Sequence, residues 1–388
     1  MTGRSTEPSS NVLRRVIISG GGTGGHIHPA LALADELRRR NPETEILFVG
    51  ALGRMEMDRI PAAGYEIIGL PITGIDRKLS MRNVLFPIRL LRSVFKAHRI
   101  LRRFAPEVAV GVGGFASGPL LWAAASRGIP TVIQEQNSFP GITNRLMARR
   151  ADLICAGFPG LQRWFPAERI TVTGNPLRHT ISGLSDKNQA KARAHFSLKP
   201  DRPTVFVMGG SLGAVSMNRA VEALIKSGAP ARAGYQLLWQ CGARHLAASE
   251  TFHAQHDAPM NVAVRGFIDR MDQAYIAADI IASRAGALAI AELAMVGKPA
   301  LLVPSPHVTE DHQTRNARSL VDRGGAQLLP DNEVVATLDA RLKALLDDAT
   351  LCAELSAGIS ACARPHAASD VIDQVESLVA NSGANPSS

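Results

Sequence analysis

Near the start of the chain, five glycines and one threonine separate a short apolar segment from a histidine. The β-branched residues 16–18 come first, residues 20–25 form the glycine run, and His26 follows directly. The apolar segment is typical of a buried parallel strand, and residues 27–40 have the spacing of a helix. This order aims backbone N–H groups and the positive end of a helix dipole at one point, which favours an anion such as a phosphate.

Two common phosphate sites fit this loop poorly. A P-loop ends in Gly-Lys-Ser/Thr, and no lysine follows these glycines. A dinucleotide fold needs an acid at the end of its second strand, whereas the next predicted strand, residues 45–50, ends in glycine. His26 adds to the case, because a helix N-terminus disfavours a cationic imidazole and so favours a neutral ring that can act as a base. A turn without a ligand and a packed or capping histidine remain the alternatives.

Predicted strands and helices alternate along the rest of the chain in two halves. In the first helix we expect Pro29 in the first turn, where its missing N–H costs nothing. Glycine loops follow further strands at residues 113–119, and the second half restarts with loops at 209–214 and 283–286. Ligands bind parallel sheets of this kind at the carboxyl ends of the strands. We therefore predict an α/β protein of two doubly wound, Rossmann-like domains that face each other across a cleft.

Composition limits the class of protein. The chain has 388 residues, 46% hydrophobic and 20% charged, which is typical of a globular protein with room for two domains. We expect a flexible N-terminus over 1–14, domains over 15–178 and 179–365, and a C-terminal helix with a disordered tail over 366–388. The four scattered cysteines favour a reducing cytoplasm without structural zinc. No apolar run reaches the ~20 residues of a membrane-spanning helix, and we expect no signal peptide.

Positive charge is concentrated in one stretch of the first half. The net charge of +9 favours anionic partners, and residues 77–103 hold nine Lys/Arg and no Asp/Glu. Basic and apolar side chains alternate there, which suggests docking on an anionic membrane through Leu79, Arg82, Leu85, Phe86, Arg89, Arg92 and Lys96. A packing helix with a solvated basic face is the alternative. Nucleic acid is disfavoured, because no aromatic residues interleave with the charges.

Acidic residues with the spacing of a metal site are missing. The chain contains no Asp-x-Asp pair, so a nucleotide-sugar enzyme with this sequence is expected to hold its diphosphate without a metal, through helix N-termini and Arg178. Glu292 is the single acid in the apolar run 287–295, where it either binds a ribose diol or lies at a solvated edge. Glu135, Gln136 and Asn137 end a predicted strand, where polar groups are functional or capping.

The ordered set of motifs resembles the MurG family of bacterial N-acetylglucosaminyltransferases, which convert lipid I to lipid II in peptidoglycan synthesis. The resemblance runs from about residue 14 to residue 365 and includes residues 20–26, 113–119, 135–137, 174–178, 209–214, 266–269, 283–292 and 311–313. Any one of these motifs is weak, but the ordered set is specific. Phe115 stands where some members carry tyrosine, and His312 where some carry glutamine.

The resemblance implies a GT-B fold and an inverting, metal-independent transfer of GlcNAc from UDP-GlcNAc, with no other cofactor. The acceptor would be the 4-hydroxyl of MurNAc in undecaprenyl-diphospho-MurNAc-pentapeptide (lipid I). His26 would be the base. The implied donor contacts are Thr23, Gly24, Gly25, Asn137, Arg178, Ser211, Ile268, Ala287, Leu288, Ala289, Ile290, Ala291, Glu292 and Gln313. Loops facing the acceptor or a diphosphate would include Gly22, Gly113, Gly114, Phe115 and Ser117.

The resemblance further implies a peripheral protein on the inner face of the cell membrane. Its partners would be UDP-GlcNAc, lipid I and the anionic cytoplasmic membrane surface, with other cell-wall synthesis proteins left open. Three other functions also remain open at this point. They are a UDP-sugar transferase with another acceptor, a UDP-GlcNAc 2-epimerase, and a UDP-sugar sensor without chemistry.

Overall fold

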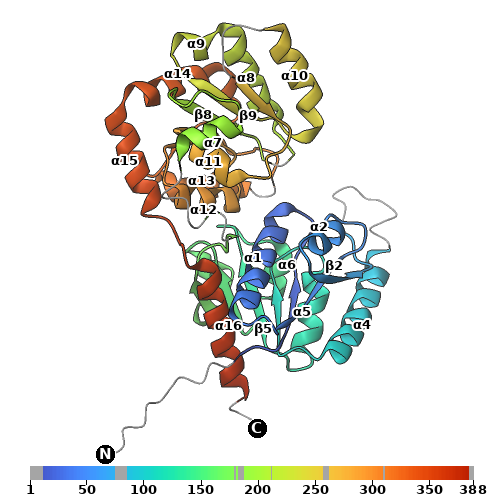
Figure 1. Ribbon diagram of the computed structural model, residues 1–388. Coiled ribbons are helices and arrows are strands. Elements are labelled where there is room, and N and C mark those ends of the chain that lie inside the picture. Colours follow the sequence, from blue (N-terminus) through green and yellow to red (C-terminus); the bar gives the residue numbers. More distant parts are fainter. Residues whose placement is uncertain are drawn as a thin grey trace, which may run out of the picture. The chain divides into compact units, whose positions relative to one another are not determined.

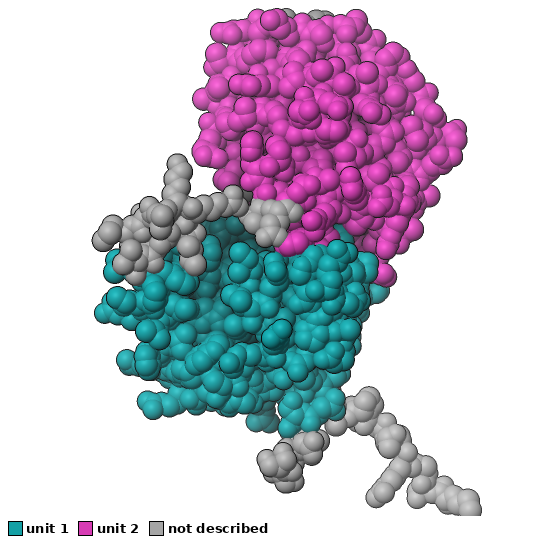
Figure 2. Space-filling view, turned by 180° about the vertical axis from the view of Figure 1, so that it is seen from behind, with its two compact units in different colours: residues 1–136, 140–176, 366–388 teal, residues 137–139, 177–365 magenta. Residues whose placement is uncertain are grey.

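The computed structural model describes residues 12–74, 85–178, 181, 188–210, 212–256, 262–308 and 311–383. The chain divides into two compact units, shown in different colours in Figure 2. Unit 1 comprises residues 1–136, 140–176 and 366–388, and unit 2 comprises residues 137–139 and 177–365. The chain therefore returns to unit 1 for its last helix.

Unit 1 is built on a seven-stranded sheet in the order β3-β2-β1-β4-β5-β6-β7. Every strand pair in it is parallel. Its strands are β1 (Arg15–Ser19), β2 (Glu45–Ala51), β3 (Glu66–Leu70), β4 (Val108–Gly111), β5 (Thr131–Glu135), β6 (Leu153–Ala156) and β7 (Ile170–Val172). Because the strand order reverses direction between β1 and β4, the loops after these two strands open a crevice at the carboxyl edge.

Helices cover both faces of this sheet. They are α1 (Gly24–Arg40), α2 (Glu56–Ala62), α4 (Phe86–Phe104), α5 (Ser117–Ala125), α6 (Ile142–Met147) and α16 (Ala367–Gly383). Successive β1 residues enter opposite cores: Val16 and Ile18 pack with α1 and α16, and Ile17 packs with α4 and α5. Figure 1 shows α16 beside α1. Arg40 of α1 joins the two helices through ion pairs to Asp373 and Glu376.

The first helix begins earlier than its pattern predicts. It starts at Gly24, so Pro29 lies inside it and the prediction of a first-turn proline is wrong. The glycines adopt the helical turn directly, and Pro29 removes the N–H that would bond to the carbonyl four residues earlier. The predicted apolar face is confirmed, since Ile27, Leu31, Ala34 and Leu37 are all buried.

Unit 2 repeats the architecture with a six-stranded sheet in the order β10-β9-β8-β11-β12-β13. Its strand pairs are also parallel. The strands are β8 (Thr204–Met208), β9 (Gln236–Gln240), β10 (Val262–Arg265), β11 (Ile280–Ser283), β12 (Ala300–Leu302) and β13 (Gln327–Leu328). The helices are α7 (Gln189–His195), α8 (Val215–Ser227), α9 (Ala229–Arg232), α10 (Leu246–Gln255), α11 (Met271–Ala277), α12 (Ala287–Val296), α13 (His312–Val321), α14 (Val334–Asp347) and α15 (Ala349–Ser360).

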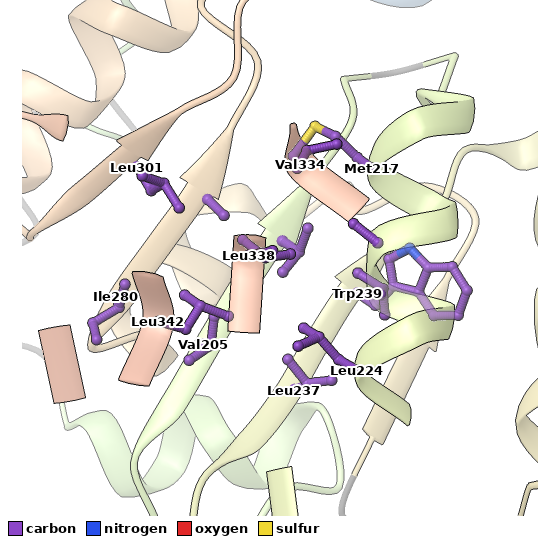
Figure 3. Packing of buried hydrophobic residues seen from close by; sticks show 14 of the residues in the cluster. Val205, Met217, Leu224, Leu237, Trp239, Ile280, Leu301, Val334, Leu338 and Leu342 are labelled. Atoms are coloured by element: carbon purple, nitrogen blue, oxygen red, sulfur yellow. The ribbon is translucent and has the colours of Figure 1, made fainter. Parts of the chain in front are cut away.

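One core of unit 2 fills the space between the sheet and two helices. Figure 3 shows Trp239 and Val205 of the sheet facing side chains such as Leu338 of α14 and Leu224 of α8. Burying a side chain of this size stabilises a fold by roughly 1.5–3 kcal/mol. The reversal of strand order falls between β8 and β11, directly before the loops at residues 209–214 and 284–286. The predicted doubly wound α/β class is confirmed for both units.

Candidate active site

The crevice of unit 1 is lined by two glycine loops that touch. Gly113 and Gly114 follow β4 with φ angles of +99° and +92°, which favour glycine. A Cβ on Gly114 would lie 2.4 Å from the Gly21 carbonyl oxygen, so the two loops meet backbone to backbone. The ring of His26 lies over Gly113, whose Cβ would come within 2.8 Å of Nε2. Glycine is therefore required where the loops and the histidine converge.

The hydrogen bonds of His26 define its tautomer. Nδ1 lies 3.0 Å from the Gly21 carbonyl oxygen and 3.3 Å from the Thr23 hydroxyl. A carbonyl can only accept a hydrogen bond, so Nδ1 carries the proton in this arrangement. The neutral ring then has its lone pair on Nε2. This is the form that can accept a proton from a substrate hydroxyl.

A buried carboxylate that sequence reasoning missed lies against the first glycine loop. Glu56, in the first turn of α2, is 1% exposed. Its Oε2 accepts from the Gly22 amide at 2.8 Å, and its Oε1 accepts from the Ala51 amide at 3.0 Å. The sequence indicates no acid at the end of the second strand, which disfavours a dinucleotide site, and β2 ends at Ala51 without one. The acid arrives five residues later, so its position in the sequence, just beyond the strand, was the available signal.

The remaining predicted residues of this crevice differ in exposure. Thr23 and Gly25 are exposed and Gly24 is half-buried, all at the N-terminus of α1. Phe115 is 42% exposed. Ser117 is fully buried, and its hydroxyl lies within bonding distance of the Ser19 and Gly113 carbonyls, so it ties β1 to the second loop. Any effect of Ser117 on a ligand would therefore pass through the loop conformation.

Polar side chains at the end of β5 form hydrogen bonds with nearby segments of unit 1. Glu135 accepts from the Gly141 amide and from Nδ2 of Asn144, which fixes the start of α6. Gln136 donates to the Val112 carbonyl at 2.9 Å and so connects the ends of β5 and β4. Of the two predicted roles, functional or capping, these contacts correspond to capping.

In unit 2, α12 begins at the end of β11 and carries Glu292. Ala287, Leu288, Ala289, Ile290, Ala291 and Glu292 all lie on this helix, with Gly286 as the N-cap. The first hydrogen bond within the helix runs from the Ile290 amide to the Gly286 carbonyl, at 2.9 Å. The amides of Leu288 and Ala289 precede it and have no acceptor within the helix, which favours an anion at this end.

The partner of Glu292 is Tyr275 of α11. Its hydroxyl donates to Oε2 at 2.6 Å, and the tyrosine is fully buried. Burial raises the pKa of Glu292 to about 7, and the hydrogen bond from Tyr275 opposes this rise. Burial, and then the nearby Glu292 carboxylate, raise the pKa of Tyr275, so it remains a donor. Neither predicted alternative included this pair, because α11 and α12 are separated by a strand in the sequence.

An ion-pair cluster braces the loops at the crevice of unit 2. Arg284, directly after β11, pairs with Asp331 at 2.6 Å and donates to the Ser216 hydroxyl at 2.8 Å. Backbone also meets backbone here, since a Cβ on Gly213 would lie 2.0 Å from the Cys241 carbonyl oxygen. Ser211, a predicted donor contact in the same loop, lies outside the described residues.

The other predicted donor contacts are spread over unit 2. Ile268 is buried, and Arg178 is exposed. Gln313 accepts from the Ser305 amide at 2.9 Å. Asn137 lies 3.4 Å from Nδ2 of Asn316, which places both on the α13 side of the unit. The described contacts thus bring Gln313 and Asn137 to one helix, while Glu292 lies on another.

The described part of the predicted membrane patch lies on α4 and on Leu85 before it, together with three exposed apolar residues that the prediction did not name, Ile88, Leu91 and Phe95. Leu85, Ile88, Leu91 and Phe95 are 43%, 54%, 60% and 71% exposed, and Arg92 is exposed beside them. Phe86 is half-buried and lines a groove of about 440 Å³ between α4, α5 and α6. Arg89 and Lys96 instead donate to Thr73 and to the Gly69 carbonyl. Leu79 and Arg82 lie outside the described residues.

Two further features concern the whole described chain. Within its described ranges, no group of three or more His, Cys, Asp or Glu side chains is arranged to hold a metal ion. No described helix is long and apolar enough to cross a membrane.

A cavity of about 750 Å³ in unit 2 is lined by residues such as Pro203, Lys298 and Leu345. None of the predicted site residues lines this cavity.

Comparison with known proteins gives concordant results. Residues 16–155 match the glycosyltransferase family 28 N-terminal domain, and residues 204–373 match its C-terminal domain. The UDP-N-acetylglucosamine–N-acetylmuramyl-(pentapeptide) pyrophosphoryl-undecaprenol N-acetylglucosamine transferase of Christiangramia forsetii is 46% identical over 95% of this chain and 98% of its own length. The enzyme of the same name from Parabacteroides distasonis is 47% identical over 94% and 98%. The crystal structure of Acinetobacter baumannii MurG superposes with a TM-score of 0.72 at 30% identity, covering 94% of this chain and 99% of that one.

Proposed function

The chain belongs to the MurG family within glycosyltransferase family 28, and from this membership we infer that it moves N-acetylglucosamine from UDP-N-acetylglucosamine to the N-acetylmuramyl group of pyrophosphoryl-undecaprenol-linked pentapeptide. The observation that carries this conclusion is identity of 46% over 95% of the chain, because it includes both glycine-loop crevices. The enzyme is thus a hexosyltransferase with a GT-B fold, and it makes lipid II for peptidoglycan.

We propose that unit 2 binds the donor. The uncapped amides of Leu288 and Ala289 suit the diphosphate, because the helix dipole and N–H groups favour an anion at that end. Glu292 suits the ribose diol, because an ionised carboxylate can accept two hydrogen bonds. Ser211, Ile268, Gln313, Asn137 and Arg178 complete the larger part of the proposed set, and Thr23, Gly24 and Gly25 of unit 1 form its smaller part. Arg178 would also stabilise the departing UDP.

We propose that unit 1 supplies the base and faces the acceptor. The MurNAc 4-hydroxyl attacks C1 of the sugar from the face opposite UDP, its proton passes to Nε2 of His26, and the bond from C1 to the UDP oxygen breaks. The anomeric centre is inverted, and UDP leaves as an anion. General-base assistance of this kind contributes roughly 10²–10⁴-fold to the rate. The tautomer fixed by Gly21 supports this role, because it puts the lone pair on Nε2.

Metal independence is part of the proposal. It rests on the sequence, which has no Asp-x-Asp pair to hold a divalent ion on a diphosphate. Helix N-termini and Arg178 would take the place of the cation. We expect turnover in excess EDTA to equal turnover with added magnesium. Full loss in EDTA with rescue by magnesium would contradict this part of the proposal.

Membrane docking through the α4 patch explains how the enzyme reaches its lipid-linked acceptor. The exposed row Ile88, Leu91 and Phe95 beside Arg92 combines apolar area with positive charge, as anionic bilayers favour. We expect Phe95→Asp to reduce co-sedimentation with phosphatidylglycerol vesicles by about tenfold or more. The matched control is Val335→Asp, which places the same charge at an exposed apolar position in unit 2. Equal loss in both variants would contradict a specific patch.

One assay separates the proposed reaction from its alternatives. The protein is incubated with labelled UDP-GlcNAc and lipid I, and the products are separated by chromatography. We expect label in a lipid product, with UDP released in equal amount. Label in UDP-ManNAc would indicate an epimerase. Label in neither would indicate another acceptor or a protein without this chemistry.

A further inference from the structure

Glu56 occupies the place that an anion would take in the first glycine loop. The carboxylate fills the space next to Gly21, where a Cβ would lie 2.2 Å from Cδ of Glu56. Both of its oxygens accept backbone N–H groups, as an ionised carboxylate does. A diphosphate that used the Gly22 amide would have to displace Glu56. The loop is therefore already filled by the protein's own carboxylate.

The same contacts lead to the proposed base. Glu56 holds Gly22 at 2.8 Å, and the preceding residue, Gly21, presents its carbonyl to Nδ1 of His26 at 3.0 Å. The Gly21 carbonyl also meets Gly114 of the second loop. A carbonyl in this position can be kept only if the peptide groups on either side of Gly21 keep their orientation. The bond from the Gly22 amide to Glu56 fixes one of them, because that amide and the Gly21 carbonyl belong to one planar peptide group.

We propose that Glu56 is a positioning residue, which orients the peptide between Gly21 and Gly22 so that His26 keeps its proton on Nδ1 and its lone pair on Nε2. The proposal rests on His26 acting as the base, as proposed above. In this proposal the glycine loop of unit 1 orients a base and does not bind a phosphate.

The test is Glu56→Gln, which keeps the volume but leaves one oxygen for two backbone donors. We expect turnover to fall roughly 10- to 100-fold, since small misplacements of a catalytic group have effects of this size. The affinity for UDP-GlcNAc, measured by calorimetry, should stay within about twofold, because the donor is proposed to bind unit 2. Loss of donor affinity equal to the loss of turnover would overturn the positioning role.

A spectroscopic measurement separates positioning from simple destabilisation. In protein labelled with ¹⁵N-histidine, the ring shifts of His26, assigned through His26→Gln, should report the Nδ1–H tautomer. In Glu56→Gln they should move towards the Nε2–H tautomer or a mixture. An unchanged tautomer together with reduced turnover would sink the proposal, even if His26 is the base. If His26→Gln itself retains turnover, it is the proposed function of His26 that fails.

The matched control is Glu107→Gln. Glu107 also accepts two backbone amides, those of Arg14 and Arg15 at 2.5 and 3.0 Å, but at the amino edge of the same sheet. We expect this variant to keep wild-type turnover and the wild-type His26 tautomer. If Glu107→Gln lowers turnover as much as Glu56→Gln does, the effect of Glu56 is general destabilisation of unit 1.

Discussion

The two crevices of the molecule begin alike and end differently. In each unit the first strand of a doubly wound sheet is followed by a glycine loop and a helix. In unit 1 the Gly22 amide is taken by Glu56, and the adjoining carbonyl holds His26. In unit 2 the Gly209 and Gly213 amides in the loop after β8 bond to backbone carbonyls, and α12 begins without a side-chain cap. One local pattern thus supports two kinds of site, and a side chain from elsewhere in the chain decides which.

Substitutions in the two crevices should therefore affect different properties, turnover in unit 1 and donor affinity in unit 2. Damage in unit 1 should lower turnover, because that crevice holds the proposed base. Damage in unit 2 should lower donor affinity, because that crevice holds the open helix N-terminus and Glu292.

The largest effect is expected at the base. We expect His26→Ala to lower turnover roughly 10²–10⁴-fold while donor affinity stays within about threefold, because the ring is proposed to take a proton in the transition state and not to anchor UDP. Steady-state kinetics and calorimetry measure the two quantities. Turnover within threefold of wild type would remove His26 from this role.

A smaller effect, in donor affinity, is expected at the carboxylate of unit 2. Glu292→Gln should weaken UDP-GlcNAc binding roughly 10- to 100-fold, since hydrogen bonds to charged groups contribute about 1.5–3 kcal/mol. The rate at saturating donor should change less. Titration of the donor into the variant measures this directly. An unchanged affinity would show that Glu292 binds only Tyr275.

The pairing of Glu292 with Tyr275 predicts a pH dependence confined to donor binding. The pKa of Glu292 is raised to about 7, so the carboxylate ionises and gains acceptor capacity as pH rises through about 7. The affinity for UDP-GlcNAc, measured by calorimetry, should rise over the same range. Tyr275→Phe removes the hydrogen bond that lowers this pKa, so the rise should move to higher pH. At pH 7 a rise of one pKa unit would lower the ionised fraction of Glu292 by about fivefold.

Two controls accompany this pH measurement. Glu292→Gln cannot ionise at that position, and its donor affinity measured by calorimetry should show no rise through about pH 7. His26→Ala should keep the pH dependence of donor binding measured by calorimetry. A profile for Tyr275→Phe that overlays the wild type would mean that the tyrosine does not act on Glu292.

The smallest effect concerns the C-terminal helix, which closes unit 1 only. Arg40→Ala removes ion pairs to Glu36, Asp373 and Glu376 and should destabilise unit 1 by roughly 1–3 kcal/mol, measured by thermal melting. Hydrogen bonds from Arg39 and then Arg40 lower the pKa of Glu36 from 4.5 to about 2. Its contribution is therefore present above pH 4.5 and lost as pH falls towards 2.

The acid range provides the check on that assignment. Wild-type stability should fall below pH 4.5 as Glu36 becomes protonated. In Arg40→Ala this fall in stability should be smaller, because only the hydrogen bonds from Arg39 to Glu36 remain to be lost. Donor affinity should not change, because unit 2 holds the donor in the proposed function. A variant with the wild-type melting temperature would show that α16 is held by its apolar contacts with α1 alone.

Periodicity and glycine spacing determined the architecture from the sequence. The segments at 16–18 and 45–50, which the sequence predicts as strands, lie within β1 and β2. Buried parallel strands are continuous apolar runs, and their short loops carry glycine, so both signals are local. The start of α1 was misplaced, because proline at a first turn is a preference and not a requirement.

Only the tertiary structure decided how the glycine loops are used. Glu56 and Tyr275 lie on helices separated in sequence from the groups they bond, and no periodicity marks such a pair. The sequence placed His26 after a glycine loop but could not say which ring nitrogen holds the proton, because that depends on a carbonyl turned by Glu56. Local patterns report the backbone, whereas the chemistry of a site depends on long-range contacts between particular atoms.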